Sequence, residues 1–304
     1  MSDDSTQPGD DENISLLERA ARKLSANQNK PSTRDSLRTK VTRSDSPDMA
    51  ARATSVASTK LSRRGEVDLI SLRETGFVVP DSPATQTAEE FRIVKRQLLL
   101  NAFARGENAI KNGNLILVCS AQPNEGKTFC AINLALSIAS ERDLTVMLVD
   151  ADFAKPEILS TLGLEGGKGL VDVIVDPSLD LSDCLIRTNI ENLAVLPAGR
   201  QHHLTTELLA SERMGAMIEE IAKRYRDRVV IFDSPPALAS SAASVLALHV
   251  GQVLFVVEAE STREPQLREG LAMISGCKNV SLLLNKTRFS TAGRRFGTYY
   301  GYGT

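Results

Sequence analysis

The sequence predicts an α/β protein with a doubly wound, mostly parallel sheet and an N-terminal arm outside the folded domain. Short, continuously apolar segments alternate with longer amphipathic ones along most of the chain, which is typical of parallel strands covered by helices on both faces. One apolar segment runs directly into a glycine-containing turn and a helix. In contrast, no Phe, Tyr or Trp precedes Phe77, so the start of the chain is a poor candidate for a packed core.

The composition excludes several classes of protein. A chain of 304 residues with 42% hydrophobic content sustains one large domain with extensions, and 4% aromatic content predicts an aliphatic core. A net charge of -2 argues against a nucleic-acid partner. The four scattered cysteines predict reduced thiols rather than a zinc site or disulfides. An acidic N-terminus and short apolar runs predict neither a signal peptide nor a membrane span, so we expect a cytoplasmic protein unless a partner holds it at a membrane.

The N-terminal arm, residues 1–65, is predicted to contain one short helix and a basic linker. Apolar residues at helical spacing predict an amphipathic helix over 13–25, which would need a partner surface or dock on its own domain. Residues 26–65 hold nine Lys/Arg against three Asp/Glu and few apolar side chains, so we expect disorder. A solvated linker is favoured over one drawn to acidic lipids.

The folded domain is predicted to cover residues 66–291. A packing segment over 68–79 ends at Pro80 and Pro83, and an amphipathic helix follows over 87–104. A strand over 115–120, a helix over 128–140 and a strand over 145–149 come next. Further apolar strands, with room for helices between them, are predicted over 192–196, 228–232, 252–257 and 280–284. Residues 292–304 form a tail rich in Gly and Tyr.

Residues 115–128 read LILVCSAQPNEGKT, a buried strand, a turn and the start of a helix. This is the context of a Walker A motif, whose backbone N–H groups hold phosphate oxygens at the positive end of the helix. Ala121 stands at the first position, where the common pattern has Gly. We expect Lys127 to reach the β- and γ-phosphates and the Thr128 hydroxyl to bind Mg²⁺. The candidate nucleotide-binding residues are Gln122, Pro123, Asn124, Glu125, Gly126, Lys127, Thr128 and Phe129.

Acidic residues follow two other strands. Asp150 and Asp152 end the strand in VMLVDADFAKP, and Asp233 ends the strand in RVVIFDSPP. Ligands of doubly wound sheets bind beyond the carboxyl ends of the strands, so the three carboxylates are expected to converge on the phosphates. A single carboxylate at the end of a strand is more often a turn or helix cap. Here the phosphate loop, the Asp-x-Asp pair and the Asp-x-x-Pro segment follow one another along the chain, and this order favours a binding site.

With these three motifs the chain resembles the bacterial tyrosine autokinases, P-loop relatives of the MinD/ParA ATPases, and most closely those of exopolysaccharide and PEP-CTERM (exosortase-associated) loci. The resemblance implies a MinD/ParA-like P-loop fold, ATP and Mg²⁺ as cofactors, and a protein-tyrosine kinase activity. By motif, Lys127 and Asp152 are catalytic, Asp152 as the base that accepts the tyrosine proton. Thr128 and Asp150 would hold the metal, and Asp233 would support it through water. Asn285 resembles an Asn of related ATPases that contacts the base of the nucleotide. Ala154 departs from the family, which often has Arg there.

Two further features fit this resemblance. Tyr299, Tyr300 and Tyr302 are three of the chain's four tyrosines, and they resemble the family's autophosphorylation tail, although an aromatic clamp on the domain is the alternative. Glu89, Arg92 and Lys95 resemble the Glu-x-x-Arg-x-x-Arg motif of ring-shaped oligomers, with Lys95 in place of the second Arg. A solvated helix face is the alternative for these three.

The expected function is therefore an ATP-dependent autokinase that regulates exopolysaccharide synthesis or export by phosphorylating the tails of neighbouring subunits. The resemblance implies two partners, other copies of the chain and a membrane polysaccharide chain-length regulator that activates the kinase. It would place the protein at the inner face of the membrane through that partner. A MinD/ParA-type ATPase switch and a nucleotide-gated scaffold for an export complex are the alternatives.

Overall fold

The computed structural model describes residues 63–80, 85–200, 202, 205–224 and 228–288 of the 304-residue chain. The chain divides into two units, Met1–Ser58 and Thr59–Thr304, and every described residue belongs to the second. The predicted helix over 13–25 and the tyrosines at 299, 300 and 302 lie outside the described residues. They stay predictions.

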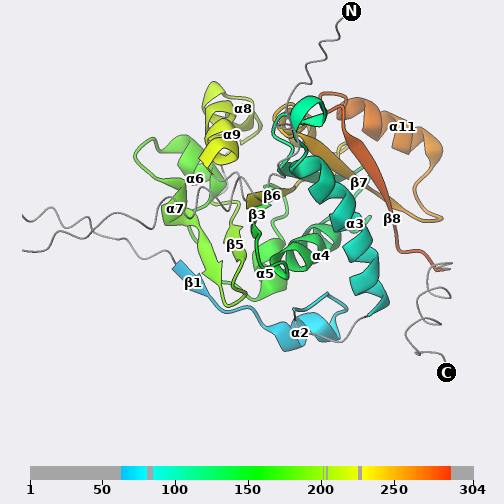
Figure 1. The fold of residues 1–304 in the computed structure, drawn as a ribbon. Coiled ribbons are helices and arrows are strands. Elements are labelled where there is room, and N and C mark those ends of the chain that lie inside the picture. The colour runs from blue at the N-terminus through cyan, green and yellow to red at the C-terminus, as the bar shows by residue number, and fades with distance from the viewer. Residues whose placement is uncertain (1–62, 81–84, 201, 203–204, 225–227, 289–304) are drawn as a thin grey trace, which may run out of the picture. The chain divides into compact units, whose positions relative to one another are not determined.

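The described residues form an 8-stranded sheet in the order β1-β4-β5-β3-β6-β2-β7-β8 (Figure 1). All neighbouring strands are parallel except β4 and β5, which are antiparallel. The predicted doubly wound, mostly parallel sheet is confirmed. The strands are β1 (Arg63–Gly65), β2 (Leu115–Ser120), β3 (Thr145–Asp150), β4 (Ile186–Thr188), β5 (Leu193–Leu196), β6 (Arg228–Asp233), β7 (Gln252–Glu258) and β8 (Val280–Asn285).

Helices cover both faces of this sheet. α3 begins where the Thr85 side chain accepts a hydrogen bond from the N–H of Ala88 at 3.1 Å, the usual role of a threonine N-cap. The helices are α2 (Leu69–Glu74), α3 (Gln86–Ala102), α4 (Lys127–Ala139), α5 (Ile158–Leu162), α6 (Leu170–Val175), α7 (Leu181–Cys184), α8 (Thr205–Leu209), α9 (Glu212–Arg224), α10 (Ala242–Ala247) and α11 (Glu264–Met273), with a 3-10 turn at Gly106–Asn108. Among these described helices, none is long and apolar enough to cross a bilayer.

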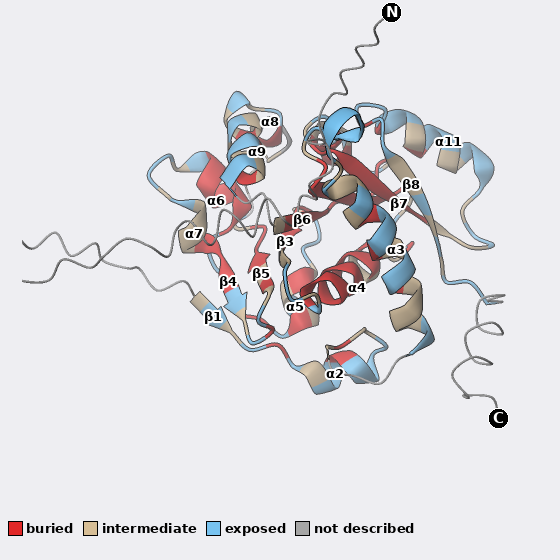
Figure 2. Cartoon of the chain, viewed as in Figure 1, coloured by how far each residue is buried: buried red, intermediate tan, exposed pale blue. Residues whose placement is uncertain are grey.

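The core lies on both faces of the sheet because successive strand residues point to opposite sides. In β2, Leu115 and Leu117 pack in the cluster with α6, α9 and α10, whereas Ile116 and Val118 pack in the cluster with α3, α4 and α5. β2 is fully buried. α4 is buried along nearly its whole length (Figure 2). The continuous apolar strands of the sequence are thus explained by helices on each side.

The structure extends the folded domain by three residues into the predicted linker. Arg63–Gly65 form β1, which pairs with β4 at the edge of the sheet. The Arg63 guanidinium donates to the carbonyl of Gly166 at 2.7 Å, so its side chain holds the end of the arm against the α5–α6 connection. A strand of three residues has no periodicity to detect, and two arginines in it look like linker composition.

The four cysteines pack in the core clusters on the two faces of the sheet. All four are free and buried. Burial raises the pKa of each thiol, and it raises that of Cys130 to about 12. Because the thiolate is the reactive form, these side chains act as small apolar residues of the core.

Candidate functional site

The loop between β2 and α4 has the backbone of a phosphate-binding loop. Gly126 immediately precedes α4 with φ 92°, in the left-handed region that favours glycine. Among the described residues no side chain caps this end of α4, so its N–H groups face the loop without a side-chain acceptor. The positive end of a helix with unpaired N–H groups is an anion site. The predicted order of strand, glycine-containing turn and helix is confirmed, and the binding of phosphate by this loop stays a prediction.

Lys127 and Asp152 form an ion pair beneath this loop. The Lys127 Nζ lies 3.1 Å from Oδ2 of Asp152, and the two side chains are only 11% and 6% exposed. Oδ1 of Asp152 accepts the N–H of Lys155 at 3.1 Å, which fixes the carboxylate after β3. The predicted phosphate-binding lysine and the predicted base therefore meet in one buried site.

Asp150 and Asp233 are direct partners in the register of β3 and β6, at the carboxyl ends of both strands. Oδ1 of Asp150 accepts the N–H of Asp152 at 3.3 Å, and Oδ2 accepts that of Ile158 at 3.2 Å. Burial raises the pKa of Asp150 to about 7 despite these bonds. Burial likewise raises the pKa of Asp233 to about 7, although the Thr128 hydroxyl and the Lys127 cation lower it in part. A pair of partly protonated buried carboxylates is a costly arrangement that functional sites retain.

The residues fit a magnesium nucleotide. Within the described part of the chain, neither Asp233 oxygen has a hydrogen-bond partner of good geometry, although the Thr128 hydroxyl faces it closely enough to affect its pKa. A buried carboxylate in that state suits a cation or its bound water. The described residues hold no group of three or more His, Cys, Asp or Glu arranged for a metal. Mg²⁺ typically uses one or two protein oxygens with phosphates and water, so this donor set agrees with it.

Two predicted nucleotide-binding residues have contacts that the motif did not show. The ring of Phe129 packs 4.9 Å from the ring of Phe77 and 6.4 Å from that of Phe91, measured between centroids, so its half-buried side chain packs against the core. The Asn285 amide donates to the carbonyl of Glu125 at 2.9 Å. The structure therefore brings Asn285 from the end of β8 onto the phosphate loop.

The three residues of the predicted oligomer motif lie on α3 but point differently. Glu89 and Arg92 form an ion pair with each other, and the Arg92 side chain is 56% exposed. Lys95 is 11% exposed; its Nζ donates to the carbonyl of Ser137 at 2.7 Å and pairs with Glu141 at 2.6 Å. Lys95 thus fastens α3 to the end of α4, while Arg92 faces outward.

Sequence reasoning missed several residues around the site. Thr262 donates to the carboxylate of Glu125, and Lys286 donates to the carbonyl of Asn124 at 2.7 Å. Sequence reasoning also missed a pair outside the phosphate loop and the acidic cluster, in which the buried Asp172 of α6 accepts from Arg200 at 2.8 Å. An isolated Thr, Lys or Asp in a connection has no motif around it, so only the proximity of Lys286 to Asn285 offered a signal.

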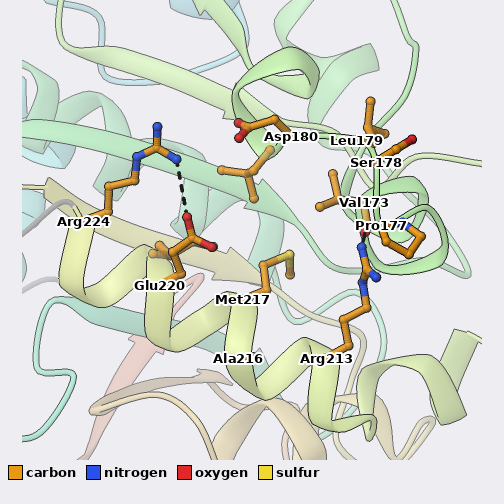
Figure 3. A pocket seen from close by; sticks show the side chains of 12 residues that line it. Val173, Pro177, Ser178, Leu179, Asp180, Arg213, Ala216, Met217, Glu220 and Arg224 are labelled. Carbon is orange, nitrogen blue, oxygen red and sulfur yellow. Dashed lines mark hydrogen bonds and ion pairs between the residues drawn. The ribbon is translucent and has the colours of Figure 1, made fainter.

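A separate pocket of about 370 Å³ lies between α9 and the α6–α7 connection (Figure 3). Val173 and Met217 line it, and Arg213 donates across it to the carbonyl of Val173 at 2.8 Å. Glu220 and Arg224 at its rim pair with each other at 3.5 Å. None of its lining residues belongs to the phosphate loop or the acidic cluster, so it does not enlarge the candidate site.

A parallel sheet with a glycine-ended loop on a helix N-terminus, a buried lysine and paired strand-end aspartates defines a P-loop nucleotide-binding protein. Residues 114–280 match the model of the family described as "AAA domain". Since the match covers more than half of the chain, the chain belongs to this family.

Two curated relatives show which P-loop proteins this chain is similar to. The chain is 29% identical over 227 residues to the putative tyrosine-protein kinase CapB of Staphylococcus aureus, and the match covers 74% of this chain and 94% of CapB. It is 30% identical over 250 residues to the succinoglycan biosynthesis transport protein ExoP of Rhizobium meliloti, where the match covers 77% of this chain and 30% of ExoP. The chain thus spans nearly all of one relative and less than a third of the other.

A solved structure has a similar fold. The chimerical protein CapA2B2 superimposes with a TM-score of 0.61 at 25% identity, covering 75% of this chain and 95% of that one. The predicted resemblance to bacterial tyrosine kinases and the predicted fold are confirmed.

Proposed function

We propose that the chain is an ATP-dependent protein-tyrosine autokinase. The observation that carries the proposal is the Lys127–Asp152 ion pair, buried at the phosphate loop beside the paired Asp150 and Asp233. This site unites a cation for phosphates, a carboxylate suited to a proton and oxygens suited to a metal. CapB is named a putative tyrosine-protein kinase, and the match to this chain covers 94% of CapB, which supports the same reaction.

In this proposal Lys127 and the N–H groups at the start of α4 would bind the β- and γ-phosphates, while Thr128, Asp150 and Asp233 would hold Mg²⁺. Bound Mg²⁺ supplies charge neutralisation on the phosphate oxygens. Once Lys127 contacts phosphates, Asp152 is released to accept the phenolic proton, which a tyrosine with an ordinary pKa near 10 retains at neutral pH. The tyrosine oxygen bonds to the γ-phosphorus, the bond from that phosphorus to the ADP oxygen breaks, and the proton passes to Asp152.

The proposed acceptors are Tyr299, Tyr300 and Tyr302 of a neighbouring copy of the chain. Self-association is proposed to use the outward Arg92 of α3 with its partner Glu89. A relative named for succinoglycan biosynthesis and transport supports a role in exopolysaccharide synthesis or export. We further propose a membrane polysaccharide chain-length regulator as activator, which would hold the protein at the inner face of the membrane.

Incubation with γ-labelled ATP and Mg²⁺, followed by phosphoamino-acid analysis, tests the function. Wild-type protein should yield phosphotyrosine, and the Lys127→Met variant should not. ATP hydrolysis without phosphotyrosine, in the presence of the activator, would instead favour a switch ATPase. Label on serine or threonine alone would contradict the tyrosine kinase.

A further inference from the structure

A buried carboxylate inside an anion-binding loop is electrostatically unfavourable, and Glu125 is such a group at 2% exposure. Both oxygens of its carboxylate accept hydrogen bonds. Oε2 accepts the N–H of Gln122 at 2.8 Å, within the loop, and Oε1 accepts the hydroxyl of Thr262 from the β7–α11 connection. The Glu125 carboxylate therefore stabilises the loop internally and connects it to the β7–α11 connection.

Thr262 is itself held in place. Its hydroxyl oxygen accepts the N–H of Glu258 at 3.0 Å, so a single side chain joins the end of β7 to the phosphate loop. The sheet order makes this contact possible, because β2, β7 and β8 are consecutive parallel strands whose carboxyl ends lie at the same edge of the sheet.

A second connection comes from the end of β8. Lys286 donates to the carbonyl of Asn124 at 2.7 Å and pairs with Glu258 at 3.1 Å. Asn285 lies so close to the loop that a Cβ added to Gly126 would be 2.2 Å from its Nδ2. The loop is thus held by side chains that follow β7 and by side chains at the end of β8.

The backbone at these contacts is in an unfavourable conformation. Asn124, Glu260 and Lys286 have φ values of 66°, 60° and 57°, one in each of the three connections that meet here. Left-handed backbone at residues other than glycine costs free energy and is retained where surrounding contacts determine it. Three such residues lie in connections that contact one another, which indicates that the contacts around the phosphate loop hold the backbone in this conformation despite its cost.

We propose that Glu125 and Thr262, supported by Lys286, form a clamp that presets the phosphate loop for the triphosphate. This rests on the proposed nucleotide-binding function. Glu125 and Thr262 act as positioning residues, since they hold the N–H groups that would bind phosphate. The clamp sets affinity for the nucleotide and contributes little to the stability of the fold.

The test is the affinity of full-length protein for the fluorescent analogue mant-ATP with Mg²⁺, measured alongside thermal unfolding without nucleotide. Thr262→Val, which removes the hydroxyl at nearly constant volume, should raise Kd about tenfold, as expected when a hydrogen bond to a carboxylate is lost. Thr262→Ser should restore near wild-type Kd. In kinase assays the Val variant should raise KM for ATP and leave kcat at saturation nearly unchanged.

Lys286→Met should weaken binding as well, whereas Lys278→Met, which removes an exposed charge before β8, serves as the matched control and should not. A Thr262→Val protein that binds mant-ATP within twofold of wild type would overturn the clamp. Equal loss of thermal stability in the Val and Ser variants, with unchanged affinity, would also overturn it. Wild-type protein that fails to bind mant-ATP would overturn the nucleotide site itself, which is a different result.

Discussion

The Lys127 ammonium lies 3.1 Å from the Asp152 carboxylate, and each is buried. The pair neutralises two charges that would otherwise be costly to remove from water. It also couples the two predicted catalytic residues, because a phosphate that attracts Lys127 weakens its hold on Asp152. The consequences of removing either partner are therefore different and measurable.

Lys127→Met should lower phosphotransfer by about 10²–10³-fold, the scale seen when one electrostatic stabiliser of a transition state is removed. The free energy of unfolding should fall by about 1–3 kcal/mol, because Asp152 keeps its buried charge without the cation. Phosphotyrosine blotting and chemical denaturation measure the two effects. Combining Lys127→Met with Asp152→Asn should recover part of the lost stability. Wild-type phosphotyrosine in the single variant would show that the site is assigned wrongly.

Asp152→Asn should reduce phosphotransfer far more than nucleotide binding, since an amide cannot accept the phenolic proton. Titration with mant-ATP and a single-turnover kinase assay separate the two quantities. Asp143→Asn, which alters an exposed carboxylate before β3, is the control and should leave both unchanged. Equal losses in binding and transfer would indicate that Asp152 is a metal ligand and not the base.

Much of the fold and site could be predicted because the signals are local. β2, the loop and α4 occupy consecutive residues, and the strand ends at Asp150 and Asp233 follow apolar runs, so parallel topology alone brings them together. The orientation of side chains could not be predicted in the same way. Phe129 reads as part of the motif yet its ring packs with Phe77, which lies far away in the sequence.

Long-range contacts explain the other differences. Lys95 matches a motif position, but its side chain reaches the carbonyl of Ser137 on another helix, and spacing within α3 does not reveal this. Thr262 carries no pattern at all, since its role depends on β7 lying next to β2. β1 depends on pairing with β4, more than a hundred residues later in the chain.

Lys95 and Arg92 of α3 should have different roles, which measurements of the protein's stability and of its self-association can separate. Lys95→Met should lower the free energy of unfolding by about 1–3 kcal/mol, because the buried carbonyl of Ser137 loses its donor. Arg92→Ala should leave unfolding nearly unchanged and shift the oligomer distribution toward smaller species. Denaturant unfolding and sedimentation velocity are the measurements. An oligomer unaffected by Arg92→Ala would remove this side chain from the proposed interface.

Asp172 should contribute stability that depends on pH. Burial raises the pKa of this carboxyl, but the Arg200 side chain and the N–H groups of Gly169 and Arg200 outweigh it and hold the pKa below its ordinary value. A depressed folded-state pKa adds stability above the unfolded value, and this stability is lost as the pH falls below about 4. Asp172→Asn should therefore be less stable than wild type at pH 7, with the difference shrinking at lower pH. A constant difference from pH 7 to pH 3 would contradict the ion pair as the cause.

Replacing Tyr299, Tyr300 and Tyr302 together with Phe should eliminate most autophosphorylation, because the acceptor oxygens are removed while the phosphate loop is untouched. Binding of mant-ATP should stay at the wild-type value, and phosphosite mapping by mass spectrometry should find the label on these residues in the wild-type protein. The fourth tyrosine gives the matched control: Tyr225→Phe should retain the phosphotyrosine signal. Each tail phosphate adds about −1.5 to −2 charge, so phosphorylated oligomers should also dissociate more readily than unmodified ones. A dominant phosphosite at Tyr225 would show that the tail is not the acceptor.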